Sequence, residues 1–409
     1  MRVERLKNGA TVVLKSRKDV SSVSVQFWLK TGAVFESDEN RGVAHFLEHM
    51  VFNGTKSFSP GEIEKIVENA GGEINAATSY DYTFYYITLP EKHVSLAVKL
   101  LKELVFFPVL SQEMVEKEKP IVLEEIARSE NNPKTFLWRE FLKHLYRETN
   151  YRNPILGFKD TVLSFSSETV KDFHSQHYHA GNLTVSVVGN VDENIFSLLQ
   201  KELEALPCGE KNSFVEIDNT SLLKKNIVLK HPAVANVHTV IGWRLPGLKE
   251  NQDIASFVIL ESLLSYGRSS VLYQEIMEKG LAYGVSAGFE EFLGGSSFYI
   301  YGITNGEKNG SFKNKIFSIL RDSFDRDSFE FAKKKILKSE IFKREAVETE
   351  AEEIGYSMTL LDNLDFYENL IEKIKAVSFE KFLNEISFLE KSPLIVELIP
   401  ETMEDSYVG

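Results

Sequence analysis

A faint internal repeat constrains the fold of this chain more than any other feature. Two stretches of the sequence, "VQFWLKTG" and "TVIGWRLPG", can be aligned with each other. When the alignment is extended forward with a short gap, tryptophan, glutamate and glycine positions match. The matched positions are Trp28 with Trp243, Glu48 with Glu261, Gly54 with Gly267, and Gly71 with Gly280. Self-similarity at this spacing predicts two lobes of one design.

The predicted boundary between the lobes is the stretch "CGEKNSFVEIDNTSLLKK", where polar residues and glycine interrupt the periodic elements. A chain of 409 residues is long for one hydrophobic core, which agrees with more than one domain. We therefore expect an N-terminal lobe over residues 1–210 and a C-terminal lobe over residues 225–409. In the second copy Val258 and Ser262 stand opposite two histidines of the first, so we expect the lobes to differ in what they bind.

Composition excludes several classes of protein. With 43% hydrophobic and 26% charged residues the chain is typical of a globular protein. A net charge of -13 without clusters of Lys and Arg argues against nucleic-acid binding. The start lacks a secretory signal, and lysines interrupt the one apolar candidate for a membrane span, "VSLAVKLLKELVFFPVL", so we expect a cytoplasmic protein without a membrane partner. Cys208 is the sole cysteine, so no internal disulfide can form.

The segment "GVAHFLEHMVFNG" is apolar nearly all round except at His45, Glu48 and His49. Burying such groups costs several kcal/mol unless each has a partner or a metal. On a helix, His45 and His49 are separated by about 40 degrees and Glu48 shares their face. Two imidazoles four residues apart can bind one zinc ion, and the carboxylate can hold a water against it. The alternative is a pair of core histidines bonded to backbone groups, with Glu48 at an exposed helix edge.

Two imidazoles do not complete a zinc site, and the acidic segment "EMVEKEKPIVLEEIARSE" offers a third ligand. Glu125 stands out because it lies in the apolar part of the segment, and Glu118 is on nearly the same helical face. Pro120 predicts a kink or a fresh helix start between them. The carboxylates of this segment are Glu113, Glu116, Glu118, Glu124, Glu125 and Glu130.

The inverted motif H-x-x-E-H, present as "HFLEH", together with the later "VLEEI", resembles the insulinase or pitrilysin-type zinc metallopeptidases. The blocks "GGEINAATSYDYTFYY", "NLTVSVVGNVD" and "GLAYGVSAGF" resemble the two-lobed branch that includes mitochondrial processing peptidase. This resemblance implies an α+β fold with two homologous lobes, each an antiparallel sheet packed against helices. It further implies His45, His49 and Glu125 as zinc ligands, Glu48 as the general base, and Glu118 as an acidic residue supporting the site.

The same resemblance implies residues that contact substrate. An extended peptide is expected to add as an edge strand beside "INAAT", with contacts from Asn75 and Ala76. Tyr283 is expected to stabilise the oxyanion, helped by an arginine shortly before it, but Val271 stands where the family pattern usually has that arginine. Arg268 lies three residues earlier and could replace it if "RSSVLYQEI" is helical. Alternatively, Arg268 only solvates the start of that helix.

A second histidine cluster, "HSQHYHAGN", also suggests a metal site. His177 and His179 would point to opposite faces of an extended segment, which is poor geometry for one ion together with His174. The resemblance to the family also implies that "HYHAGNL" is a structural lead into a strand.

The favoured hypothesis is a zinc-dependent endopeptidase that hydrolyses peptides or unfolded polypeptide segments inside a closed chamber. The chain carries one metal site and two lobes, whereas longer members of the family enclose substrate between four, so we expect a homodimer. One alternative is a non-catalytic assembly or processing-partner subunit of the same fold. Another is a metal-dependent binding protein without turnover.

Overall fold

The structure is a computed structural model and describes residues 1–213, 216–218, 220–322 and 324–403. The chain groups into two compact units, each assembled from three stretches. The first unit comprises Met1–Ile126, Asn153–Val215 and Phe342–Tyr367, and the second comprises Ala127–Arg152, Glu216–Ile341 and Glu368–Gly409. Each unit thus includes a piece of the opposite predicted lobe. Residues 214, 215 and 219 of the predicted boundary lie outside the described residues.

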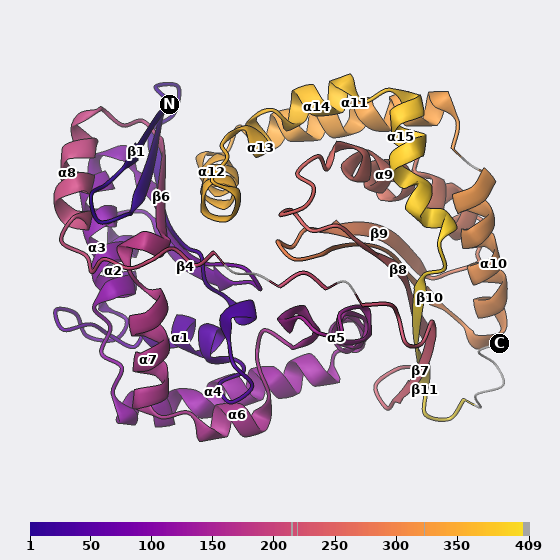
Figure 1. Ribbon diagram of the computed structural model, residues 1–409, viewed down its shortest axis with the longest axis horizontal. Coiled ribbons are helices and arrows are strands. Elements are labelled where there is room, and N and C mark those ends of the chain that lie inside the picture. Colours follow the sequence, from indigo (N-terminus) through magenta and orange to yellow (C-terminus); the bar gives the residue numbers. More distant parts are fainter. Residues whose placement is uncertain (214–215, 219, 323, 404–409) are drawn as a thin grey trace. The chain divides into compact units, whose positions relative to one another are not determined.

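The first unit is built on a six-stranded sheet with the strand order β1-β2-β6-β3-β5-β4 (Figure 1). Neighbouring strands are antiparallel except β2 and β6, which are parallel. Its strands are β1 (Arg2–Arg5), β2 (Thr11–Ser16), β3 (Ser22–Leu29), β4 (Glu73–Thr78), β5 (Thr83–Pro90) and β6 (Leu183–Gly189). Its helices are α1 (Val43–Val51), α2 (Glu62–Asn69), α3 (Val94–Phe106), α6 (Lys159–Ser164), α7 (Ser167–His177), α8 (Asn194–Leu203) and α12 (Val347–Leu361), with the 3-10 turns η1 (Ala33–Phe35), η2 (Glu91–His93) and η4 (Ala180–Asn182).

The second unit is built on a five-stranded sheet with the order β7-β11-β8-β10-β9, in which only β7 and β11 are parallel. Its strands are β7 (Asn226–His231), β8 (Val237–Leu245), β9 (Gly284–Glu290), β10 (Ser296–Thr304) and β11 (Leu394–Pro400). Its helices are α5 (Pro133–Leu145), α9 (Ala255–Ser265), α10 (Gly306–Asp322), α14 (Leu370–Ala376) and α15 (Phe379–Glu385), with the turns η3 (Asn150–Arg152), η5 (Tyr273–Met277) and η6 (Ile386–Glu390). Helices α4 (Gln112–Asn131), α11 (Arg326–Lys343) and α13 (Asp365–Glu368) include residues of both units.

The predicted repeat is confirmed by the topology. The order β2-β6-β3-β5-β4 corresponds strand for strand to β7-β11-β8-β10-β9, with the parallel pair in the same place. The matched tryptophans lie near the ends of β3 and β8, and the matched glutamates lie on α1 and α9. Both matched glycine pairs have positive φ: +97° and +73° at Gly54 and Gly267, and +78° and +63° at Gly71 and Gly280. The fold is α+β as predicted, with each sheet antiparallel except at one pair.

Each half of the chain contributes a helix to the sheet of the other half. Helix α12 packs on β3 and β6 of the first sheet, and α5 packs on the corresponding strands β8 and β11 of the second. Glycines allow the close approach: a Cβ at Gly355 of α12 would lie 2.1 Å from Trp28 Nε1, and a Cβ at Gly242 of β8 would lie 2.4 Å from Phe141 Cζ. The compact units therefore differ from the contiguous predicted lobes because of this exchange.

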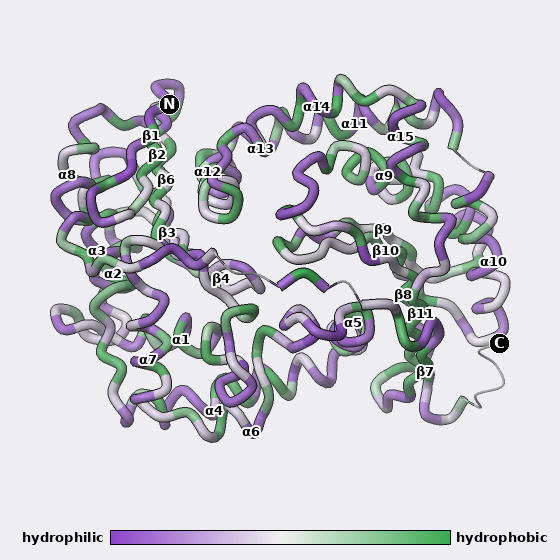
Figure 2. Tube along the Cα trace, in the orientation of Figure 1, coloured by the Kyte–Doolittle hydropathy of each residue, from purple (hydrophilic) through white to green (hydrophobic). Residues whose placement is uncertain are grey.

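The main core of the first unit lies between its sheet and helices α1 and α3. Phe27, Tyr85, Phe46 and Leu101 are fully buried there. Strand β8 and helix α9 of the second unit are largely hydrophobic, whereas the edge strand β4 of the first sheet is not (Figure 2). Among the described residues, the helices that reach the required length are too polar to span a bilayer.

Candidate metal centre

Helix α1 carries two histidines and a glutamate into a buried setting. Its apolar residues are buried against the core, and His45 is only 8% exposed. The buried Glu36 caps the helix start, because its carboxylate accepts from the backbone N–H groups of Gly42 and Ala44, each at 2.9 Å. Burial raises the pKa of Glu36 to about 8, against the lowering effect of these two hydrogen bonds, so the group stabilises the helix start by hydrogen bonding rather than by charge near pH 7. This cap holds the histidine helix in place.

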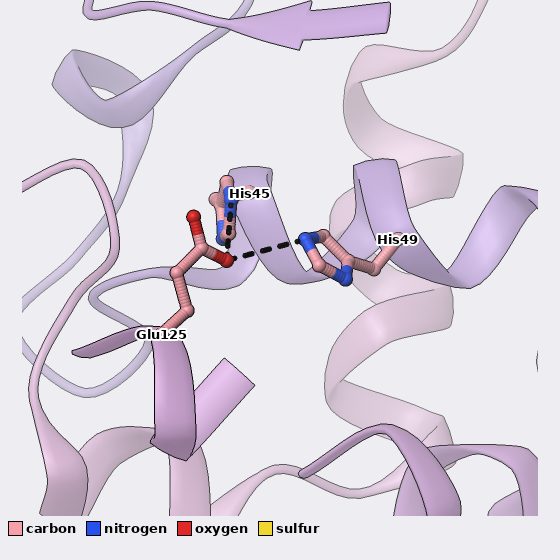
Figure 3. A group of neighbouring side chains, drawn as sticks. All are labelled: His45, His49 and Glu125. Carbon is pink, nitrogen blue, oxygen red and sulfur yellow. Dashed lines mark ion pairs between the residues drawn. The ribbon is translucent and has the colours of Figure 1, made fainter. Parts of the chain in front are cut away.

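His45 and His49 point toward Glu125 of helix α4 (Figure 3). His45 Nε2 lies 3.6 Å and His49 Nε2 lies 3.5 Å from Glu125 Oε2, and one ligand atom of each residue lies within 4.8 Å of the others. Ligand atoms around a tetrahedral zinc ion, with bonds of about 2.0–2.2 Å, lie roughly 3.3–3.6 Å apart. Two imidazoles and a carboxylate also match the donor set of catalytic zinc sites, which leave one position open. The three residues therefore fit a zinc ion.

The electrostatics of the cluster suit a cation. Burial and the neighbouring His49 lower the pKa of His45 to about 4, so its ring is neutral near pH 7, the form that binds a metal. Burial also lowers the pKa of His49, but its hydrogen bonds to Glu118 and Glu125 outweigh burial and raise this pKa to about 9. Carboxylates thus surround the rings and favour positive charge between them.

Glu118 and Asn53 form an outer layer around His49. Glu118 Oε1 lies 2.9 Å from His49 Nδ1, and the Asn53 amide donates to Glu118 Oε2 at 2.7 Å. The hydrogen bond to His49 lowers the pKa of Glu118, against the raising effect of burial. An outer carboxylate of this kind orients a ligating ring. Here it directs His49 Nε2 toward Glu125.

Of the two expectations at Pro120, the fresh helix start is wrong, because α4 runs from Gln112 to Asn131 with Pro120 inside it, and the kink stays a prediction. The carbonyl of Glu116 loses its intrahelical donor at this proline. Both residues are exposed, so water can take the place of the lost donor. The continuous helix brings Glu118 and Glu125 to the same side, facing α1.

Glu48 is half-buried beside the cluster. Its Oε2 accepts a hydrogen bond of 2.5 Å from the Thr78 hydroxyl at the end of β4. Burial raises the pKa of Glu48, while the hydrogen bonds from Thr78 lower it. The carboxylate is therefore close to the candidate ligands without belonging to the group that could hold the metal.

Strand β4, which carries Asn75 and Ala76, forms one edge of the first sheet and pairs only with β5. Asn75 is exposed, and its side-chain Oδ1 accepts from the Ala76 backbone N–H at 2.9 Å. An unpaired edge is a template for an added strand.

The other residues predicted to contact substrate, Tyr283 and Arg268, belong to the second unit. Tyr283 is 64% exposed and directly precedes β9. Arg268 lies in an exposed turn, and the helical segment begins only at Val271. The condition for placing Arg268 and Val271 on one helical face is therefore not met, because the turn that starts at Gly267 (φ +73°) separates Arg268 from the helix.

The second histidine cluster is held by other polar groups. His174 Nε2 bonds the Val105 carbonyl oxygen at 2.9 Å, and His177 Nδ1 lies 3.0 Å from the Asn212 amide nitrogen. His179 Nε2 lies 3.3 Å from Asn182 Nδ2. Among the described residues, His45, His49 and Glu125 are the one group of three or more acidic, histidine or cysteine residues that could hold a metal.

Sequence reasoning missed three residues that support this site: Glu36, Asn53 and Thr78. Asn53 lies four residues after His49, a spacing that could have suggested proximity. Glu36 lies seven residues before α1 begins, and the N-cap position itself is Gly42, so the capping pattern gave no signal for it. Nothing in the local sequence distinguishes Thr78 from other strand threonines.

Two family models match consecutive parts of the chain. The model described as insulinase (peptidase family M16) matches residues 11–159, and the model described as peptidase M16 inactive domain matches residues 164–336. An uncharacterized zinc protease of Rickettsia felis is 31% identical over 311 residues, covering 75% of this chain and 74% of the relative. The zinc protease PqqE of Helicobacter pylori is 31% identical over 286 residues, covering 67% of this chain and 63% of that protein.

Solved structures share the fold. A protease from Helicobacter pylori is similar with a TM-score of 0.89 and 24% identity, covering 98% of this chain and 99% of the other. A protein from Pseudomonas fluorescens, described as a peptidase M16 inactive domain, is similar with a TM-score of 0.88 and 18% identity, covering 99% and 98%. Together with the family models, which span most of the sequence, these likenesses lead to one conclusion: the chain belongs to the insulinase family, peptidase family M16.

Proposed function

We propose that this protein is a zinc-dependent endopeptidase that hydrolyses peptides or unfolded polypeptide segments. The observation that carries the proposal is the convergence of His45, His49 and Glu125, with the Glu48 carboxylate beside them. The relatives named as zinc proteases support the reaction class. His45 is buried and Glu48, His49 and Glu125 are partly buried, and removing such groups from water is costly unless they have partners or a metal.

In this proposal each side chain has a defined task. Zinc, when bound, polarises the scissile carbonyl and lowers the pKa of water. Glu48 removes a proton from the attacking water as the new C–O bond forms, and it delivers that proton to the leaving amine as the C–N bond breaks. Glu118 keeps the His49 ring oriented, and Asn53 keeps Glu118 in place.

The free edge of β4 is the proposed docking site for the peptide backbone. Ser79 N–H donates to the Tyr82 carbonyl at 2.8 Å, and hydrogen-bonding direction alternates along a strand. The backbone groups of Ala76 and Thr78 therefore face away from β5, toward the free edge. A substrate carbonyl would displace the Asn75 side chain from the Ala76 N–H, and the peptide would continue as an added strand.

Peptide hydrolysis tests the proposal directly. The purified protein is incubated with a mixed peptide library, with and without a chelator, and products are identified by mass spectrometry. Internal cleavage that stops with chelator and returns with zinc is the expected result. Intact peptides under all conditions would instead favour a non-catalytic subunit of the same fold.

Two residues of the second unit are proposed to contact the substrate carbonyl. Tyr283→Phe removes an exposed hydroxyl donor, and we expect kcat/KM to fall by roughly 10- to 1000-fold, as loss of one oxyanion donor does. Arg268 lies in a turn and not on the helical face of Val271, so it would have to reach the substrate from that turn, and Arg268→Ala should then have a similar effect. Zinc content and Tm should not change in either variant. Unchanged hydrolysis by Arg268→Ala would limit the contact to Tyr283.

The working form is proposed to be a homodimer that encloses substrate. One chain provides two sheet units and one metal cluster, and two chains would provide four units around a chamber. Sedimentation should show a dimer, and the enzyme should cut short peptides while sparing stable folded proteins. A fully active monomer, or rapid digestion of a folded protein, would refute this arrangement.

A further inference from the structure

Thr78 occupies a special position at the end of the edge strand β4. Side chains alternate along β4, so that Ile74, Ala76 and Thr78 are half-buried and the residues between them are exposed. The Thr78 hydroxyl thereby reaches Glu48 Oε2 at 2.5 Å. Because threonine is branched at Cβ, few rotamers are open to it, and the donor is held in one direction by the strand.

Thr78 is also the main polar partner of the Glu48 carboxylate. Within the described part of the chain, no other side chain forms a hydrogen bond with Glu48. Burial disfavours the ionised form of this carboxyl, and the hydroxyl and backbone of Thr78 oppose that effect. Without these donors the carboxylate would be buried with no fixed orientation.

The contact distinguishes the two oxygens of Glu48. Oε2 accepts a hydrogen bond from the Thr78 hydroxyl, so Oε1 is the oxygen on which, among the described residues, no side chain donates and which is most open to a water. A carboxylate with one oxygen fixed cannot rotate freely about its terminal torsion, which is otherwise broad. The reactive oxygen is thus aimed before substrate arrives.

We infer that Thr78 is the positioning residue for Glu48 and that it joins peptide docking to proton transfer through strand β4. The inference rests on the proposed peptidase function. A peptide paired with β4 is aligned by the same strand whose last residue aims the base. Strand β4 therefore positions both the substrate backbone and the reactive oxygen of Glu48. Such preorganisation favours a reactive geometry.

Thr78→Val tests the inference, because valine keeps the shape and β-branching but lacks the hydroxyl. We expect kcat to fall by roughly 10- to 100-fold, since a small misplacement of a catalytic group has effects of this size. KM and zinc content should stay close to the wild-type values, because neither the strand edge nor the metal cluster changes. Thr78→Ser restores a hydroxyl and should recover most of kcat.

Thr88→Val is the matched control. Thr88 lies on the neighbouring strand β5, and its hydroxyl also donates to a glutamate, Glu348 Oε2, at 3.2 Å. The chemical change is the same, but this glutamate is not part of the proposed chemistry. Thr88→Val should hydrolyse peptides at the wild-type rate. Equal losses in Thr78→Val and Thr88→Val would reduce the role of Thr78 to general sheet stability and overturn the inference.

A second measurement does not depend on activity. In metal-free protein, thermal unfolding is compared for Thr78→Val, Glu48→Ala and the double variant, because each single change removes one partner of the hydrogen bond. If the two side chains act on each other, the shift in Tm of the double variant is smaller than the two single shifts added together. Additive shifts, or full kcat in Thr78→Val while wild type shows chelator-sensitive cleavage, would reject the inference. Absence of cleavage by wild-type protein would reject the peptidase proposal itself.

Discussion

Replacing Glu48 with glutamine should abolish most peptide hydrolysis while zinc stays bound. Glutamine has nearly the same size and still accepts the hydrogen bond from Thr78, but it cannot take a proton from water. Loss of a general base lowers kcat by about 100- to 10,000-fold. Zinc content should be unchanged, since Glu48 lies outside the group that could hold the metal. Steady-state kinetics and metal analysis of the same preparation provide both values.

The repeat supplies a matched control for this variant. Glu261 is the residue of α9 that aligns with Glu48, and Glu261→Gln makes the same change in the half that lacks the histidines. It should retain wild-type kinetics. Undiminished hydrolysis by Glu48→Gln would rule out Glu48 as the base, and a protein that only binds metal would show no difference between the two variants.

Removing any residue of the metal cluster should have the second large effect. His45→Ala, His49→Ala and Glu125→Ala each leave two of the three donor atoms that lie within 4.8 Å of one another. Changes in outer-layer residues alone cost 10- to 100-fold in metal affinity or activity, so loss of a direct ligand should exceed about 100-fold in activity. Zinc content per chain, measured by atomic spectroscopy, should fall from about one ion to a small fraction.

Glu124→Gln is the control for this set, because Glu124 is an exposed neighbour on the same helix. Its zinc content should match that of the wild type. Full zinc content in Glu125→Ala would move the ligand role to Glu118 or Glu124.

The parts of the site that sequence predicts best are local. His45, Glu48 and His49 share a helical face because of their spacing alone. The structure directs both histidines toward Glu125 (Figure 3) and places Glu48 near His49. Glu125 comes from a different helix, so spacing could not single it out among the acidic residues of its segment. The resemblance to the family did so, and the distances of 3.5 and 3.6 Å agree with that choice.

Long-range features escaped prediction for physical reasons. A fresh helix start was one of two expectations at Pro120, but one lost hydrogen bond at an exposed position did not outweigh the rest of a 20-residue helix. Thr78 meets Glu48 only after β4 has joined its sheet. The alignment of Trp28 with Trp243 correctly predicted two similar sheets, yet a repeat pattern does not reveal which helix covers which sheet.

The exchange of α5 and α12 affects how the protein can be made. The sheet of the first unit, whose helices α1 and α4 carry the metal cluster, packs against α12, so this unit stays incomplete until residue 367 has been synthesised. Until then Trp28, which is fully buried in the finished protein, lacks its packing partner Gly355. A ribosome-bound fragment that ends at the predicted boundary between the lobes would expose Trp28 and be prone to aggregation. We therefore expect the two halves of the chain to complete their folding together. Splitting the gene at the predicted boundary would leave each product without the helix that completes its sheet.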